Sequence, residues 1–432
     1  MSTTNRLTKP FYALLSLPAT AMGFALCVQI ATLSWILNSK YGFDIHEIGL
    51  VWIAGPLAGI LGQVIVGVIS DKVWFWNGRR RPFIIIGGTV AALMILALPY
   101  IDVINETLGI GSLIGVALTV ALTLDLAINV SFNPARSIIA DVTPQGEART
   151  KGYTWMQTIS GFFGVLAYLV GAFIGNYFLI YSGAVFVFIC AIIPPFFIKE
   201  PRELTEAENL EETNLQVSKE TNWPTFLKIC FAHAFTWIGV QTMFIYTFAY
   251  VKEVIMGFET TASLSDTQNN QIGFSIGIAF AILNTVGFIF PALVLEPVAE
   301  KIGRVKTHTI AIAIMAIGYA LIVFFGQSMT SLFILIGLVG IGWAAVVSLP
   351  FAIMSEVVDQ SKMGLMMGLF NLSVVLPQIV ASNLGGFIGR QADKSMIFII
   401  SAITLGISAV LWLIVKEQKK EGASAQVSGG HH

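Results

Sequence analysis

Asp125, Asn129 and Arg136 interrupt a mainly apolar run over 113–139, in which Ser131 and Asn133 are the other polar members. A carboxylate at the depth of a membrane is energetically costly, and such acids usually mark the path of an ion or a substrate. At about 100° per residue of helix, Asn129 lies about 40° and Arg136 about 20° from Asp125. The three side chains therefore share one face, which we expect to line a central cavity.

Asp125 and Arg136 are too far apart to form a salt bridge along one helix. Eleven residues rise about 16 Å, and at an effective dielectric near 20 the attraction is only about 1 kcal/mol. Desolvation then favours the neutral carboxyl, and we predict that Asp125 loads and unloads a proton. The alternatives are a structural carboxylate bonded to neighbouring helices and, for Arg136, a side chain that snorkels to the interface.

The composition requires that this face be held by membrane-spanning helices. Of 432 residues, 56% are hydrophobic and 11% are charged, and the mean hydropathy is +0.79. Soluble domains carry about 25% charged residues. A net charge of −1 argues against a nucleic-acid partner. Cys27, Cys190 and Cys230 fall in apolar runs and are interpreted as core residues, so neither a metal nor a cofactor is expected.

The apolar runs predict an all-α integral membrane protein with twelve transmembrane helices. A helical span needs about 20 apolar residues. The expected spans are 11–38, 46–70, 82–101, 112–140, 152–177, 178–198, 224–251, 271–295, 307–326, 329–353, 363–389 and 395–416. They form two pseudo-symmetric six-helix bundles, 1–198 and 224–416, joined by a polar cytoplasmic linker, 199–223, and followed by a cytoplasmic tail, 417–432.

The distribution of basic residues predicts the orientation. With both termini in the cytoplasm, 19 of the 24 lysines and arginines lie on cytoplasmic segments and four lie outside. Cytoplasmic loops carry the excess of positive charge in membrane proteins. We therefore expect a multi-pass protein of the cytoplasmic membrane with both termini on the cytoplasmic side.

Two short patterns recur in the two halves and predict a cytoplasmic gate. An acid, a base and then Gly-Arg follow both the second and the eighth span, and a proline followed by an acid recurs after the fourth and the tenth. Equivalent halves are typical of rocking transporters, and ion pairs at the helix ends can latch one side shut. The alternative, that 79–81 only anchors the topology, does not explain the repeated acid and glycine. The residues assigned to the gate are Gly67, Asp71, Gly78, Arg79, Arg80, Arg81, Asp141, Arg149, Glu300, Gly303 and Arg304.

These patterns resemble the major facilitator superfamily. The insert 73–77 before Gly-Arg is similar to that of the sucrose–proton symporter branch of the glycoside–pentoside–hexuronide cation symporters, and 52–56, 124–141 and 371–378 agree with it. The resemblance implies the major facilitator fold, which usually works as a monomer, and the proton-driven import of a disaccharide or other glycoside by alternating access. It also implies that Asp125 accepts the proton and that Asn129 and Arg136 contact the sugar.

The chain departs from the plant members of that branch in the seventh span. Their aspartate aligns with Tyr246, although a basic–acid pair, Lys252 and Glu253, is kept. The sequence therefore leaves open whether the sugar is of the sucrose or the maltose type.

The remaining sugar contacts are expected from amide and aromatic side chains inside the spans, which suit a neutral, hydroxyl-rich ligand. Trp237 and Gln241 are four residues apart and share a helix face with His233, which is interpreted as structural. For each amide, hydrogen bonding between helices is the alternative. The further candidates are Gln29, Trp237, Gln241, Asn371 and Gln378.

Two features that the sequence lacks bear on the coupling ion and on the class of activity. No span other than the fourth carries an acid near its middle, which favours a proton over sodium. The sequence shows neither a glycine-rich phosphate loop nor a nucleophile–base pair, so we do not expect an enzyme. The alternatives to a symporter are a sugar uniporter or exporter with the same fold and a non-transporting sugar sensor.

Overall fold

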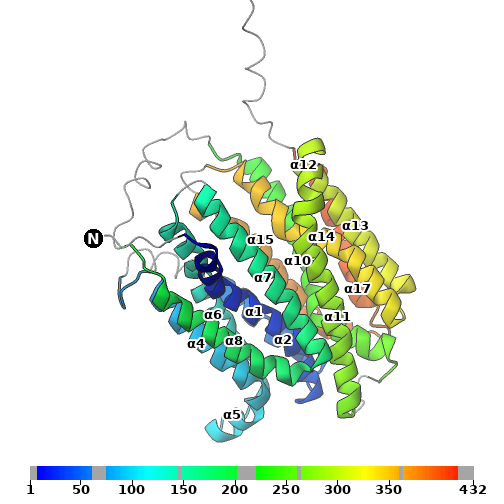
Figure 1. Ribbon diagram of the computed structural model, residues 1–432. Coiled ribbons are helices and arrows are strands. Elements are labelled where there is room, and N and C mark those ends of the chain that lie inside the picture. The colour runs from blue at the N-terminus through cyan, green and yellow to red at the C-terminus, as the bar shows by residue number, and fades with distance from the viewer. Residues whose placement is uncertain are drawn as a thin grey trace, which may run out of the picture.

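The computed structural model describes residues 7–60, 74–144, 147–201, 220–259, 264–359 and 363–416, and within them it contains helices and no strands (Figure 1). The first half comprises α1 (Lys9–Ser39), α2 (Ile45–Trp52), α4 (Arg81–Ala97), α5 (Ile101–Leu108), α6 (Leu113–Val142), α7 (Glu147–Phe173) and α8 (Asn176–Phe197). The second half comprises α10 (Trp223–Ala249), α11 (Asp266–Phe290), α12 (Glu296–Ile302), α13 (Arg304–Phe325), α14 (Met329–Ser355), α15 (Met363–Asn383), α16 (Gly385–Gly389) and α17 (Met396–Trp412).

The helices confirm the predicted all-α membrane architecture. In the described part of the chain, ten helices are long and apolar enough to cross a membrane, and Ile45–Ile60 and Met396–Trp412 are shorter apolar helices. Each of the twelve predicted spans overlaps one of these. π-helical turns at Tyr250–Ile255 and Pro291–Leu295 continue the spans formed by α10 and α11. The second lies within the predicted span 271–295, whereas the first runs beyond the predicted end at 251.

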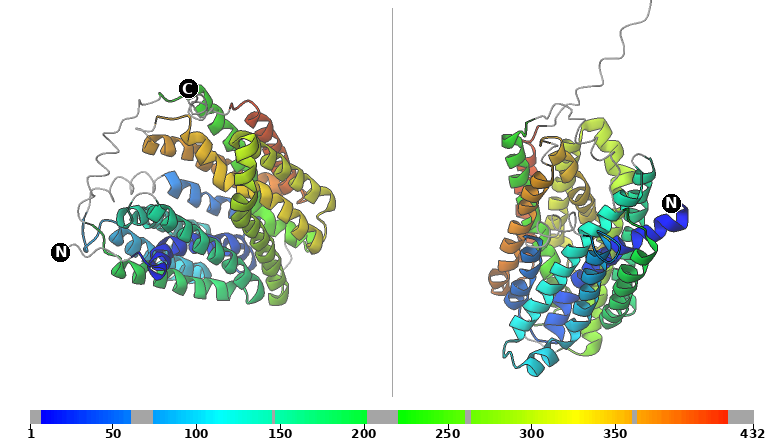
Figure 2. Two further views of the ribbon diagram at one scale, coloured as in Figure 1. Left: turned by 45° about the horizontal axis from the view of Figure 1, so that its top comes forward. Right: turned by 90° about the vertical axis from the view of Figure 1, so that its left-hand side faces the viewer.

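Helix ends and packing follow from local sequence. The side chain of Ser112 caps α6 by accepting from the Gly115 amide at 3.1 Å, which satisfies one of the free N–H groups of the first turn. α1 packs on α7 and α8, and α4 on α6 and α8; in the second half α10 packs on α15 and α17, and α13 on α14 and α17. Figure 2 shows the helices of the two halves gathered on opposite sides of the molecule.

The two halves meet mainly through two pairs of surfaces, and α1 also packs against α10 and α11. α7 packs against α11, and α2 packs against α15 and α16. We call the end of the molecule at which α1 finishes and α5 lies the Asn38 side, and the opposite end, which carries α12, the Arg80 side (Figure 1).

Hydrogen bonds between the halves gather on the Asn38 side. Three of those between described residues start or end near the end of α1, and the side chains of Tyr168 and Asn284 are also hydrogen-bonded within the interface of α7 and α11. The three bonds near the end of α1 are Ser34 Oγ to the Ile245 carbonyl (2.9 Å), Trp35 Nε1 to the Asn269 carbonyl (2.8 Å) and Lys252 Nζ to Asn38 Oδ1 (3.2 Å). The hydrogen bonds that α1 makes to described residues of the second half therefore lie at one end of the molecule.

A glycine brings α2 against the second half at the same end. A Cβ on Gly49 would lie 2.2 Å from the Ser382 carbonyl oxygen and 2.5 Å from the Tyr246 hydroxyl. Such distances are too short for any side chain, so only glycine allows this approach. Tyr246, which stands where plant relatives are expected to carry an aspartate, donates its hydroxyl to the Ser382 carbonyl at 2.7 Å.

Candidate functional site

Asp125 is buried between α6, α1 and the start of the second span. Its side chain accepts a hydrogen bond from Gln29 Nε2 at 2.9 Å, and both residues are almost inaccessible, with 6% and 2% exposed. A Cβ on Gly55 would lie 3.6 Å from Asp125 Oδ2, so this helix also contacts the carboxyl. Among the described residues the carboxyl has a neutral amide as its hydrogen-bond partner and no paired cation.

Asn129 and Arg136 continue the same face of α6. Asn129 Nδ2 donates to the backbone carbonyl oxygen of Asp125, one helical turn earlier, at 2.8 Å. The guanidinium carbon of Arg136 lies 4.0 Å from the centroid of the Phe132 ring, a cation–π contact, and the Arg136 side chain is exposed. The face thus runs from a buried acid through a half-buried amide to an exposed cation.

The candidates on α10 form a hydrogen-bonded aromatic cluster. Trp237 Nε1 donates to His233 Nε2 at 2.8 Å, and the buried His233 ring stacks on Phe370 of α15 with centroids 5.0 Å apart. Because His233 accepts from one aromatic residue and stacks on another, its contacts agree with the predicted structural role. Trp237 also meets Trp343 of α14 edge to face, at 6.3 Å between centroids.

Two of the predicted amides bind each other. Gln378 Nε2 on α15 donates to Gln241 Oε1 on α10 at 3.3 Å. Asn371 lies on α15 two turns before Gln378 and is half-buried. The interhelical alternative is therefore realised for this pair, although each amide retains further donor and acceptor capacity. The structure places Gln29 on the carboxyl of Asp125, a partner that the sequence did not predict.

In the first half, the gate arginines hold an acid at the end of α6. Arg79 Nη2 and Arg80 Nε each lie 3.1 Å from Asp141 Oδ2, and the Asp141 side chain is 5% exposed. Arg149 Nη2 donates to the Ala140 carbonyl at 3.1 Å, where it caps a free carbonyl of the helix end. Gly67 and Asp71, also assigned to the gate, lie outside the described residues.

Sequence reasoning missed Glu200, which organises this loop. Its carboxylate accepts the backbone N–H groups of Arg79, Arg80 and Arg81 at 2.8, 2.7 and 2.9 Å. These groups open α4, where free N–H donors and the helix dipole favour an anion. A Cβ on Gly78 would lie 2.5 Å from Glu200 Oε1 and 2.9 Å from the Arg81 Cβ, so the glycine leaves room for this carboxylate. The sequence feature that could have indicated Glu200 is its position as an acid at the end of an apolar span.

The second half contains a matching ion pair. Arg304 Nη1 pairs with Glu356. Glu356 directly follows α14, in the same way that Asp141 lies at the end of α6. The two sequence echoes therefore meet in space within each half. Gly303 adopts φ +95 between α12 and α13, a region open to glycine, and Glu300 is exposed on α12. These ion pairs lie inside the halves, so the gate itself stays a prediction.

The helices and the site define a class of protein. Membrane-spanning helices in two halves, with an acid buried at the depth of the spans, are the architecture of a transporter. A sequence model of the Major Facilitator Superfamily matches residues 15–294 and 264–431, and the chain belongs to this family of multi-pass membrane transporters. The predicted family and the predicted absence of enzymatic function are confirmed.

Curated relatives agree with the predicted branch. The sucrose transport protein SUT2 of Oryza sativa subsp. indica is 24% identical, over 94% of this chain and 93% of its own length. The general alpha-glucoside permease of Schizosaccharomyces pombe is 28% identical, over 40% of this chain and 34% of its own length.

Solved structures support the fold. The inward-open xylose transporter XylE from E. coli has a TM-score of 0.70 at 13% identity, over 95% of this chain and 97% of its own. The nucleoside transporter NupG has a TM-score of 0.65 at 13% identity, over 93% of this chain and 97% of its own.

Proposed function

We propose that this protein is a proton-coupled symporter that imports a disaccharide or other glycoside. One observation carries the proposal: the carboxyl of Asp125 is buried at mid-span against a neutral partner, Gln29. An acid kept as a permanent anion would need a paired cation, because an unpaired buried charge is strongly unfavourable. The sucrose transport proteins and the glucoside permease among the relatives support a sugar as the substrate.

The contacts of Asp125 suit a group that alternates between two protonation states. As a carboxylate it accepts from Gln29 Nε2. As a neutral acid it becomes a donor, and the amide of Gln29 can offer its oxygen instead. The carboxyl and the amide can thus stay hydrogen-bonded to each other in both states.

The sugar is proposed to bind beside the acid, between the two halves. Asn129 and Arg136 supply amide and guanidinium donors along α6. From the second half, Gln241, Gln378, Asn371 and Trp237 supply amides and an aromatic ring, and Gln29 can exchange its bond to Asp125 for one to a sugar hydroxyl. Occupancy and protonation are then linked, as symport requires.

The described conformation is proposed to be the inward-facing one. The distribution of lysine and arginine makes the Arg80 side cytoplasmic, and the halves are hydrogen-bonded on the opposite, Asn38 side. The two bundles, 1–198 and 224–416, rock about the site, and the protein acts as a monomer in the cytoplasmic membrane. In the outward-facing state, the loops that carry Arg79–Arg81 and Arg304 meet and close the cytoplasmic side.

Proteoliposomes test the proposal. The purified protein is given a panel of sucrose, maltose, other glycosides and monosaccharides, and proton uptake is recorded with and without sodium. Sugar-dependent proton uptake without sodium is expected. Counterflow without proton movement indicates a uniporter, sugar binding without counterflow indicates a sensor, and a signal only with sodium contradicts the assignment of the ion.

A further inference from the structure

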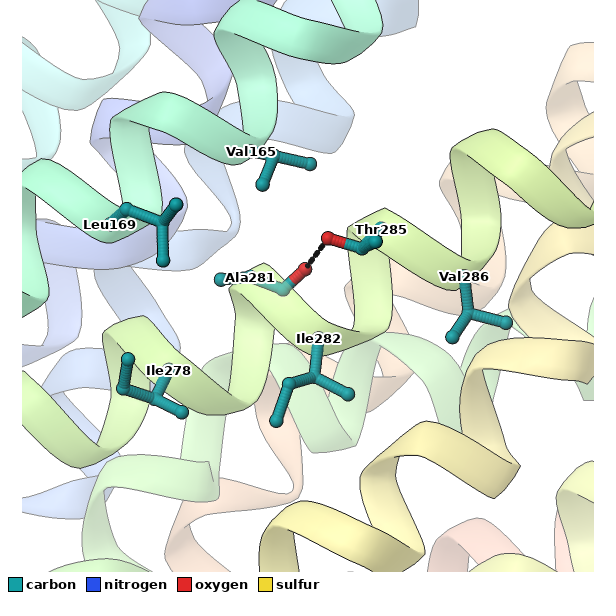
Figure 3. A pocket seen from close by; sticks show the side chains of 7 residues that line it. All are labelled: Val165, Leu169, Ile278, Ala281, Ile282, Thr285 and Val286. Atoms are coloured by element: carbon teal, nitrogen blue, oxygen red, sulfur yellow. Dashed lines mark hydrogen bonds between the residues drawn. The ribbon is translucent and has the colours of Figure 1, made fainter.

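An apolar groove of about 250 Å³ lies between α7 and α11, one helix from each half. Figure 3 shows Val165 and Leu169 of α7 on one wall and Ile278, Ala281 and Ile282 of α11 on the other. An apolar cavity of about 150 Å³ already holds a molecule of the size of benzene. The groove is therefore large enough for several methylene groups.

Direct contacts between the helices bound the groove at both ends. A Cβ on Gly161 of α7 would lie 2.2 Å from the Phe288 ring of α11, and a Cβ on Gly277 of α11 would lie 2.9 Å from that of Ala172. The helices run antiparallel, so these two contacts lie about 16 Å apart along α7. The groove is thus a gap in an interface that is otherwise closed.

Exposed stripes on both helices show that the groove opens away from the protein core. On α7, Val165 and Leu169 share a helix face with the exposed side chains of Phe162 and Phe173. On α11, Ile278 and Ile282 lie on the face that carries the exposed Phe274 and Ile289. Because both helices span the membrane, these stripes face the hydrocarbon of the bilayer.

Water is a poor occupant of this groove. Thr285 carries the one side-chain polar group on its walls, and its hydroxyl already donates to the Ala281 carbonyl at 2.7 Å (Figure 3). An ordered buried water needs two to four polar partners. The apolar walls therefore suit a hydrocarbon chain and offer water too few hydrogen-bond partners.

We propose that the groove between α7 and α11 is a binding site for an acyl chain of a membrane phospholipid. A chain seated there contacts both halves at mid-membrane depth. Since the walls belong to helices that move relative to each other when the halves rock, the bound chain stabilises the arrangement in which the groove exists. The composition of the bilayer then shifts the conformational balance, whatever the transported substrate is.

Photocrosslinking tests the site independently of transport. The protein is placed in phosphatidylcholine nanodiscs that contain a trace of phosphatidylcholine with a diazirine at mid-chain, and crosslinked peptides are mapped by mass spectrometry. Labelling of 165–169 and 278–286 is expected to exceed labelling around Val185, an exposed position on α8, by about fivefold, the ratio that ~1 kcal/mol gives.

A matched pair of variants separates the groove from the general lipid surface. Val165→Phe fills the groove and is expected to reduce the labelling of the groove to the level of α8. Val185→Phe adds the same volume to an open face of α8 and is expected to leave the labelling of the groove unchanged. Leu169→Phe replaces the first variant if that protein is not monodisperse. Equal labelling of the groove and α8 in the unmodified protein, or groove labelling that persists in the filled variant, overturns the proposal.

Discussion

Replacement of Asp125 by Asn tests the proton role with minimal change in shape. The Asn side-chain oxygen can still accept the bond that Gln29 Nε2 gives to the carboxyl at 2.9 Å, so the helices are expected to stay in place. The variant loses only the ability to bind and release a proton. We therefore expect Asp125→Asn to exchange sugar across the membrane but not to accumulate it.

The size of the effect follows from the energy of the gradient. One proton crossing a potential of 100 mV releases about 2.3 kcal/mol. At about 1.4 kcal/mol for each tenfold step, coupling to one proton concentrates a neutral sugar by roughly 40- to 50-fold. Without coupling, the ratio of inside to outside concentration falls to about one.

Proteoliposomes with an inside-negative potassium diffusion potential measure this ratio with labelled disaccharide. Asp102→Asn is the matched control, because that carboxylate is exposed and pairs with Lys40 at 3.3 Å on the Asn38 side. The control should accumulate sugar like the unmodified protein. Accumulation by Asp125→Asn at the unmodified level would refute the reasoning, since the sugar would then be driven without this carboxyl.

The gate and the closed end give further expectations. Asp141→Asn breaks a buried ion pair and should lower the free energy of unfolding by about 3–5 kcal/mol. Glu356→Gln breaks a half-exposed pair and should lower it by less than about 1 kcal/mol. Thermal unfolding in detergent measures both, and equal shifts of the two variants would contradict this ranking. Glu200→Ala leaves three backbone N–H groups of α4 without their acceptor and should destabilise by about 1–3 kcal/mol in the same assay. Gly49→Ala forces the halves apart on the Asn38 side and should slow counterflow, whereas Gly406→Ala, with nothing within 4 Å, should not; identical rates would show that the close approach at Gly49 is dispensable.

The sequence predicted features that depend on one helix at a time. Spans follow from the length of apolar runs, and the common face of Asp125, Asn129 and Arg136 follows from helical periodicity. It did not predict which residues meet across helices, such as Gln241 with Gln378 or Gln29 with Asp125. Those pairings depend on the register between helices distant in sequence, which the period of a single helix does not encode. Glu200 was missed for the same reason.

The hydrogen bonds that close the Asn38 side also set an energy scale for the cycle. The three bonds near the end of α1, at a net 0.5–1.5 kcal/mol each, amount to roughly 1.5–4.5 kcal/mol. One proton moving through 100 mV supplies about 2.3 kcal/mol, which is of the same order. In the proposed proton-coupled cycle, breaking these bonds on the Asn38 side therefore takes an energy of the same order as one proton supplies. Reversing the gradient is then expected to reverse the direction of transport.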